Sequence, residues 1–190
     1  MVCYLASATA PAPAVASGEW LINGETLVEK GILSETVTGE PDPLNEPELV
    51  VPELGLSFYC ANVTINGKIS RGGASNAALT FTECELLGAP DCEVTVAPAT
   101  TTSKVPGLFY PVGAAFTTMT VGGEFCPLEF DGESITGAVG INVPAETARP
   151  LIEEYPKGGL VFLSFQSAEL TGAVELELDG ANAGEPWTAD

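Results

Sequence analysis

The chain has 190 residues, of which 6 are Lys or Arg and 26 are Asp or Glu, so its formal net charge is −20 at pH 7. Charged residues make up 17% of the chain and hydrophobic residues 45%, a balance that argues against intrinsic disorder. A surface this acidic repels phosphate groups, so we expect no nucleic-acid partner and no binding to an anionic membrane.

The chain contains no histidine. This removes the Ser-His-Asp and Cys-His catalytic pairs, His-ligated zinc and the commonest proton carrier near neutral pH. Paired carboxylates could still catalyse glycoside hydrolysis, but among 26 acidic residues some pair will lie at a suitable separation in any fold. We therefore predict that the protein is not an enzyme and holds no cofactor.

The first residues, MVCYLASATAPAPAVASG, carry no charge, and Ala14-Val15-Ala16 matches the pattern that signal peptidase cuts. The positive segment and long apolar core of a full secretion signal are missing. We interpret residues 1–17 as a signal-peptide remnant or, alternatively, as an extended N-terminal arm in polyproline II conformation. Residues 18–190 are predicted to form a single antiparallel β domain.

Strand patterns dominate residues 18–190. The 21 Gly and 15 Pro interrupt the chain too often for long helices, and β-branched and aromatic residues alternate with small polar ones. The prediction is an all-β fold, an antiparallel β-sandwich or barrel-like domain with at most one short helix. Strands are expected at Glu19–Ile22, Thr26–Thr38 in two pieces, Leu54–Ser70, Ala77–Leu86, Glu93–Ala97, Ala114–Val121, Ser134–Val143, Gly159–Gln166 and Glu169–Leu178.

Four other segments carry local signals of their own. Asn23-Gly24 predicts a two-residue hairpin turn. The proline-rich and acidic segment Gly39–Pro52 is typical of an extended surface loop. Ala145–Tyr155 is the one helical candidate, but Pro150 favours a short turn over three full turns. Val105–Gly123 lacks charge over the length of a membrane span, but its prolines and glycines favour a buried strand and a loop, so no membrane span is predicted.

Four cysteines follow residue 17, namely Cys60, Cys84, Cys92 and Cys126. If the strands around Arg71-Gly72-Gly73 form a hairpin centred on Gly72, Cys60 lies opposite Cys84, close to disulfide reach. Elimination then pairs Cys92 with Cys126. The spacing contains no C-x-x-C, so zinc is disfavoured, while four reduced thiols remain the alternative for a cytosolic protein.

Ligand-binding signals are weak. The strongest calcium candidates are Asp131 and Glu133, but neither they nor the acids of Glu40–Glu48 follow the EF-hand order of ligands, so no metal site is predicted. Trp20 and Trp187 are more typical of core side chains than of sugar-stacking platforms. The sequence does not identify a small-molecule ligand.

Four segments together resemble a loose group of uncharacterised secreted proteins of high-GC Gram-positive bacteria (actinobacteria). They are SGEWLINGETL, GLSFYCANVTINGKISRGGASNAALTFTECELLGAPDCEVT, FTTMTVGGEFCPLEFDGESITGAVGI and AELTGAVELELDGANAGEPW. The resemblance implies a secreted, disulfide-containing β protein. It implies no activity and no cofactor.

These observations lead to a functional hypothesis. The mean hydropathy of +0.25 is high for so acidic a chain, so excess apolar surface is expected to be buried between subunits. We expect a secreted structural protein, at the cell surface or extracellular, that forms a homo-oligomer or polymer such as a surface layer, sheath or filament through β-strand edges. The alternatives are a phage virion decoration or tail protein, and a carbohydrate-binding module.

Overall fold

The computed structural model describes residues 18–104, 108–140, 143, 146–152, 159–163 and 166–189. In these ranges the chain is all β apart from one 3-10 turn, η1 (Arg71–Gly73). The strands are β1 (Trp20–Ile22), β2 (Glu25–Thr26), β3 (Ser34–Pro41), β4 (Glu48–Val51), β5 (Leu56–Ser70), β6 (Ser75–Leu86), β7 (Glu93–Val96), β8 (Ala99–Ser103), β9 (Leu108–Pro111), β10 (Thr117–Gly122), β11 (Phe130–Gly137), β12 (Val139–Gly140), β13 (Leu151–Ile152), β14 (Leu160–Phe162), β15 (Gln166–Thr171), β16 (Val174–Asp179) and β17 (Trp187–Ala189).

Eight antiparallel strands close into a barrel. The order is β5, β6, β7, β10, β11, β14, β15 and β4, and β4 pairs again with β5. A closed ring leaves no unpaired edge within it. The predicted all-β, barrel-like antiparallel fold is therefore confirmed.

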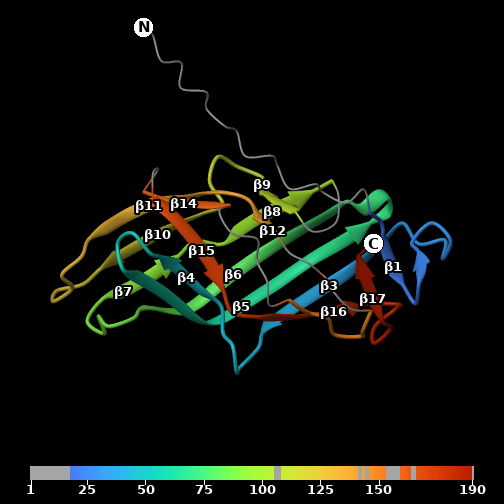
Figure 1. The fold of residues 1–190 in the computed structure, drawn as a ribbon, viewed down its shortest axis with the longest axis horizontal. Coiled ribbons are helices and arrows are strands. Elements are labelled where there is room, and N and C mark those ends of the chain that lie inside the picture. Colours follow the sequence, from blue (N-terminus) through green and yellow to red (C-terminus); the bar gives the residue numbers. More distant parts are fainter. Residues whose placement is uncertain are drawn as a thin grey trace, which may run out of the picture.

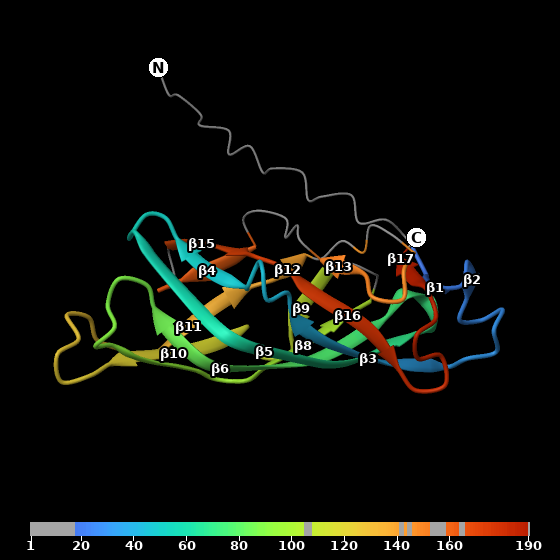
Figure 2. The same cartoon turned by 90° about the horizontal axis from the view of Figure 1, so that it is seen from below.

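The long hairpin of β5 and β6 extends beyond the barrel and carries a second set of strands. Figures 1 and 2 show this hairpin running along the molecule. Outside the barrel, β6 pairs with β8, which continues to β9 and β12, while β5 pairs with β3, which continues to β16 and β13. A separate small sheet, in the order β17, β1, β2, joins the two ends of the described chain.

Each half of the hairpin has its own hydrophobic core. The barrel encloses one cluster, in which Phe58, Met119 and Phe162 are buried. The second cluster lies where the small sheet meets β3 and β16, and it includes Trp20, Trp187 and Leu176. Thus one continuous hairpin connects two cores.

Local turn signals were accurate predictors. Asn23-Gly24 joins β1 to β2, and both residues have positive φ, at 54° and 73°, as a tight two-residue hairpin turn requires. The hairpin of β5 and β6 has the register expected from a centre at Gly72, with Val63 opposite Phe81. Both predictions are confirmed.

Two assignments were wrong. Gly39–Pro52 was expected to be a loop throughout, but β3 continues to Pro41 and β4 occupies Glu48–Val51. Strand β4, the apolar end of this segment, pairs with β5 and buries Val51. Packing therefore outweighs the preference of the surrounding prolines for a loop. In Ala145–Tyr155 the described residues 146–152 form a bridge at Thr147 and strand β13, with no helical turn.

The segment expected to be one strand, Glu169–Leu178, forms two. Gly172 has a φ of +93° and separates β15 from β16, and a Cβ there would collide with the carbonyl oxygen of Glu46. Only glycine permits both the turn and the close approach. By contrast, Gly67 lies inside β5 without a break.

Two sequence predictions concern the membrane and the N-terminus. The described chain contains no helix with the length and hydropathy needed to span a bilayer. The expected signal remnant or arm, residues 1–17, lies outside the described residues.

Candidate functional site

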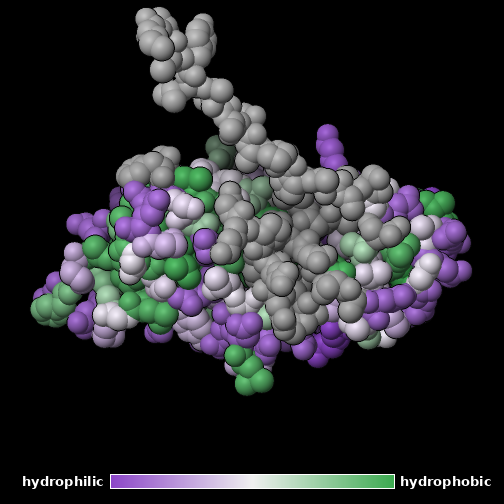
Figure 3. Space-filling model, viewed as in Figure 1, coloured by the Kyte–Doolittle hydropathy of each residue, from purple (hydrophilic) through white to green (hydrophobic). Residues whose placement is uncertain are grey.

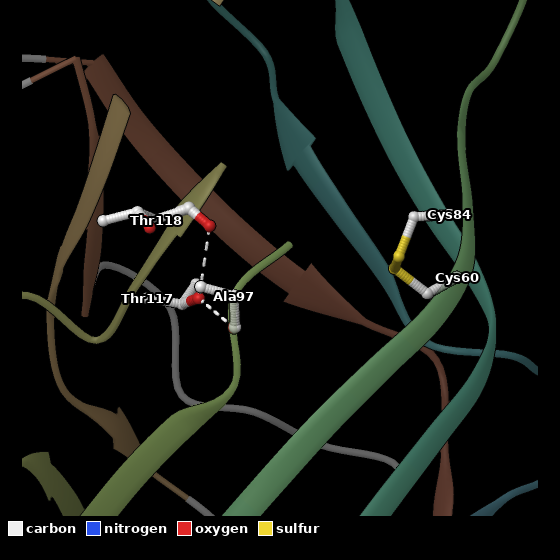
Figure 4. The surroundings of a disulfide bond; sticks show 5 residues. All are labelled: Cys60, Cys84, Ala97, Thr117 and Thr118. Atoms are coloured by element: carbon white, nitrogen blue, oxygen red, sulfur yellow. Dashed lines mark hydrogen bonds between the residues drawn. A yellow bond between two sulfur atoms is a disulfide. The ribbon is translucent and has the colours of Figure 1, made fainter. Parts of the chain in front are cut away.

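Two disulfides cross-link the barrel half of the molecule. Cys60 of β5 is bonded to Cys84 of β6, with an S–S distance of 2.04 Å, within the barrel (Figure 4). Cys92 is bonded to Cys126 and joins the loop before β7 to the loop after β10. These are the pairs expected from the hairpin register and by elimination. Disulfides persist in oxidising surroundings, so the structure indicates an oxidising compartment.

The calcium candidates lie in a β-bulge. Met119 of β10 faces Glu133, whereas Val121 faces Phe130, so β11 carries an extra residue between these pairs. Gly132, with a φ of +66°, lies in this interval beside Asp131. Among the described residues no three potential metal ligands come together. The Asp-Gly-Glu sequence is therefore explained by strand geometry.

Two of the carboxylates that accept hydrogen bonds are linked to a shifted pKa. The hydroxyl of Tyr59 donates to Glu46 at 2.6 Å, and this bond is the main reason why the pKa of Tyr59 rises to about 12. The backbone amide of Thr26 donates to Glu29, and this bond lowers the pKa of the Glu29 carboxyl. Both bonds fix local loops.

The two tryptophans are buried against each other. Their ring centroids lie 5.9 Å apart, and the rings are tilted by 52°. Trp20 donates its indole N–H to the carbonyl of Ala74, which ties β1 to the tip of the long hairpin. Because neither ring is exposed, neither forms a surface platform for stacking on a sugar.

A cavity of about 110 Å³ lies on the inner face of the long hairpin, between the two cores. The hairpin contributes alternate residues that share this face, among them Ile65 and Ile69 from β5 and Ala77 and Leu79 from β6. Gly67 faces Ala77 at its centre, so the two smallest side chains of this face lie opposite each other. Both residues lie in the cavity wall.

Two polar atoms in the cavity wall have no partner. Within the part of the chain that the structure describes, Ser75 Oγ and Trp187 Nε1 are buried and form no hydrogen bond. The residues are only 5% and 1% exposed, respectively. Two other polar groups in the wall are satisfied, since Thr101 donates to the carbonyl of Ala77 and Trp20 donates to that of Ala74. Sequence reasoning missed this site, because it emerges only when β6 and β17 are brought together.

The two ends of the long axis carry exposed apolar side chains. At one end lie the loops 87–92 and 123–129, at the left of Figures 1 and 2, and at the other lies the loop 27–33. Phe125 is 75% exposed in the first group, and Leu33 is 73% exposed in the second. Figure 3 shows hydrophobic surface at both ends of the face in view.

The same two ends differ in charge. The segments 87–93 and 123–129 contain four acidic residues, Asp91, Glu93, Glu124 and Glu129, and no Lys or Arg. Four of the six Lys and Arg residues of the chain lie around the opposite end, namely Lys30, Lys68, Arg71 and Lys104, and they are mixed there with Glu19, Glu25, Glu29 and Glu185. Lys30 pairs with Glu185, whereas the other three form no ion pair among the described residues. We call the first surface the acidic end and the second, after the cations it carries, the basic end.

Comparison with protein-family models, curated proteins and solved structures yields no match for this chain.

Proposed function

We propose that the protein is an extracellular structural subunit that performs no catalysis and assembles end to end into a filament, sheath or surface layer. The observation that carries this proposal is the presence of exposed apolar side chains at both ends of one elongated molecule, with only acidic charges at one end and most of the cations of the chain at the other. The two disulfides support an extracellular location, since such bonds persist outside the cell.

The two ends are suited to contact each other. Phe125 projects from a loop whose base is held by the Cys92–Cys126 disulfide, so this side chain is presented by a covalently fixed segment. Glu124 precedes it and adds negative charge. On the next subunit Leu33 offers apolar area, and Arg71, whose guanidinium is held by the carbonyl of Ile32, offers positive charge beside it. Apolar anchors with a charged rim are typical of protein interfaces.

Different surfaces at the two ends imply an open assembly. A contact between identical patches stops at a dimer, whereas a contact between two different patches continues until it closes into a ring or extends as a filament. Ends opposed along the long axis favour extension. A filament is therefore the simplest product of this arrangement.

Strand edges are less suited to the contact than the ends. The closed barrel has no edge, and the outer sheet ends in β12 and β13, which have two residues each. So few backbone groups provide little pairing for a neighbouring strand. We therefore locate the subunit contacts at the ends.

Sedimentation velocity and electron microscopy of the full chain over a range of concentrations at physiological salt would test this function. Phe125→Asp should abolish assembly, because it removes the apolar anchor and places another negative charge at the acidic end. Leu44→Asp is the matched control, since Leu44 is 94% exposed on the loop between β3 and β4, away from both ends. This control variant should assemble like the unmodified chain.

A mixing experiment tests the head-to-tail arrangement. Phe125→Asp blocks the acidic end, while the double variant Lys68→Glu and Arg71→Glu blocks the basic end. Each variant alone should remain monomeric, but together they should form a dimer that grows no further, because each retains one intact end. A strictly monomeric unmodified chain at high concentration would refute the proposed function.

A further inference from the structure

We propose that the cavity between the two cores is a binding site for a small neutral amphiphile: an alkyl alcohol or ketone of roughly six to eight carbons with one oxygen at its end. This inference is independent of end-to-end assembly. It rests on the size of the cavity, the apolar character of its walls and the two unpartnered polar atoms.

The volume fits a short hydrocarbon chain. The cavity of about 110 Å³ is bordered by a second void of about 50 Å³, which shares Val63, Phe81 and Phe116 with it. An engineered apolar cavity of about 150 Å³ in another protein stays dry and binds benzene. The combined space therefore suits a ligand of similar or slightly greater size that extends toward the barrel core.

The two unpartnered atoms define the end group of the ligand. The indole N–H of Trp187 can only donate, whereas the hydroxyl of Ser75 can both donate and accept. One oxygen that accepts from both groups would satisfy them together. Buried polar groups are rarely left unpaired, and where they are, an occupant with matching polarity is a direct explanation.

The end group is expected to be neutral. Lys68 is the only charged residue in the wall among those described, but strand alternation directs its side chain to the face opposite Ile69, and it is exposed. A carboxylate in the cavity would thus lie without a facing cation, which opposes binding. Alcohols and ketones avoid this penalty while keeping the acceptor oxygen.

The chain offers its own optical probe, because Trp20 and Trp187 are its only tryptophans and both line the cavity. We expect 8-bromooctan-1-ol to quench their fluorescence saturably through the bromine atom. 1-Bromooctane, which lacks the oxygen, should bind about three- to tenfold more weakly, as expected from the loss of a hydrogen bond. Octanoate should bind less well than octan-1-ol when each competes with the brominated alcohol.

Two variants separate this site from other modes of quenching. Ser75→Ala should lower the affinity for 8-bromooctan-1-ol part of the way toward that for 1-bromooctane, because Trp187 still donates, and it should leave the affinity for 1-bromooctane unchanged. Ala77→Met should fill the cavity and abolish saturable quenching by both, and near-ultraviolet circular dichroism would verify that each variant is folded. Performing the titrations in the Phe125→Asp background keeps the result separate from any effect of assembly.

Three outcomes would overturn the proposal. The first is the absence of saturable quenching of the folded chain. The second is equal affinity for the brominated alcohol and the brominated alkane, which would leave Ser75 and Trp187 without a role in binding. The third is unchanged quenching in a folded Ala77→Met variant, which would place the quencher elsewhere.

Discussion

Removal of the disulfides tests the energetic basis of the barrel. The first perturbation is the double substitution Cys60→Ala and Cys84→Ala, and the second is Cys92→Ala and Cys126→Ala. Alanine avoids introducing a hydroxyl at Cys60 and Cys92, which are both buried. Each double variant removes one covalent link and leaves the other intact.

The magnitudes follow from the lengths of the closed loops. The sequence separations are 24 residues for Cys60–Cys84 and 34 for Cys92–Cys126. In the chain-entropy relation such loops stabilise the folded state by about 3.5 and about 3.8 kcal/mol, respectively. The loops do not overlap in sequence, so removing both links should lower the free energy of unfolding by about 7 kcal/mol.

This loss is comparable to the whole stability of many domains, which is about 5–15 kcal/mol. We therefore expect each double variant to fold with reduced stability, and the variant lacking both disulfides to be unfolded or close to its unfolding midpoint at room temperature. Urea unfolding followed by far-ultraviolet circular dichroism measures the changes through the midpoint and slope. Reduction of the unmodified chain with dithiothreitol provides a control for the alanine substitutions.

The reasoning would fail if either pair could be removed at a cost below about 1 kcal/mol. It would also fail if one pair cost several times more than the other, because the loop lengths predict nearly equal effects. A larger loss for one pair would mean that packing around the sulfur atoms, and not loop closure, provides the stabilisation.

Three further predictions concern single residues. Gly172→Ala should lower the free energy of unfolding by more than the roughly 1–2 kcal/mol that a positive φ costs alone, because its Cβ would meet a backbone oxygen. Gly31 has a φ of +72° and open space around it, so Gly31→Ala should cost only roughly 1–2 kcal/mol. Urea unfolding measures both changes. Trp187→Ala should lower the free energy of unfolding by about 3–5 kcal/mol in the same assay, since it leaves a large void in the second core. Alkaline absorbance titration should find Tyr59 ionising near pH 12, and Glu46→Gln should shift this ionisation toward 10. Because the folded-state pKa is the higher one, this small stabilisation is present below pH 10 and is lost as the pH rises through 12.

Features set by neighbouring residues could be predicted from the sequence. The turn at Asn23-Gly24 depends on two residues that tolerate positive φ, and the pairing of Cys60 with Cys84 depends on counting outward from Gly72. In both cases the signal lies within a single hairpin. The period of two along a strand then determines which side chains share a face.

Features set by distant pairings could not be predicted. The barrel closes through contacts such as Leu49 of β4 with Leu170 of β15, which are far apart in the sequence. The sequence near Glu48–Val51 does not indicate that this segment pairs with β15, and the surrounding prolines favour a loop. The cavity has the same origin, because its polar atoms, at Ser75 and Trp187, belong to strands joined only by tertiary packing.

The asymmetry of the long hairpin connects the stable barrel with the cavity. In the barrel half, β5 and β6 are linked by Cys60–Cys84 and pack against a core of large side chains. In the other half, the hairpin lines a cavity of about 110 Å³, and two polar groups are buried without partners among the described residues. Such underpacking costs stability, and proteins commonly retain it only where it serves a function. Because two disulfides stabilise one half of the fold, the molecule can tolerate a loss of stability in the other half. For this reason we regard the cavity as a retained binding site.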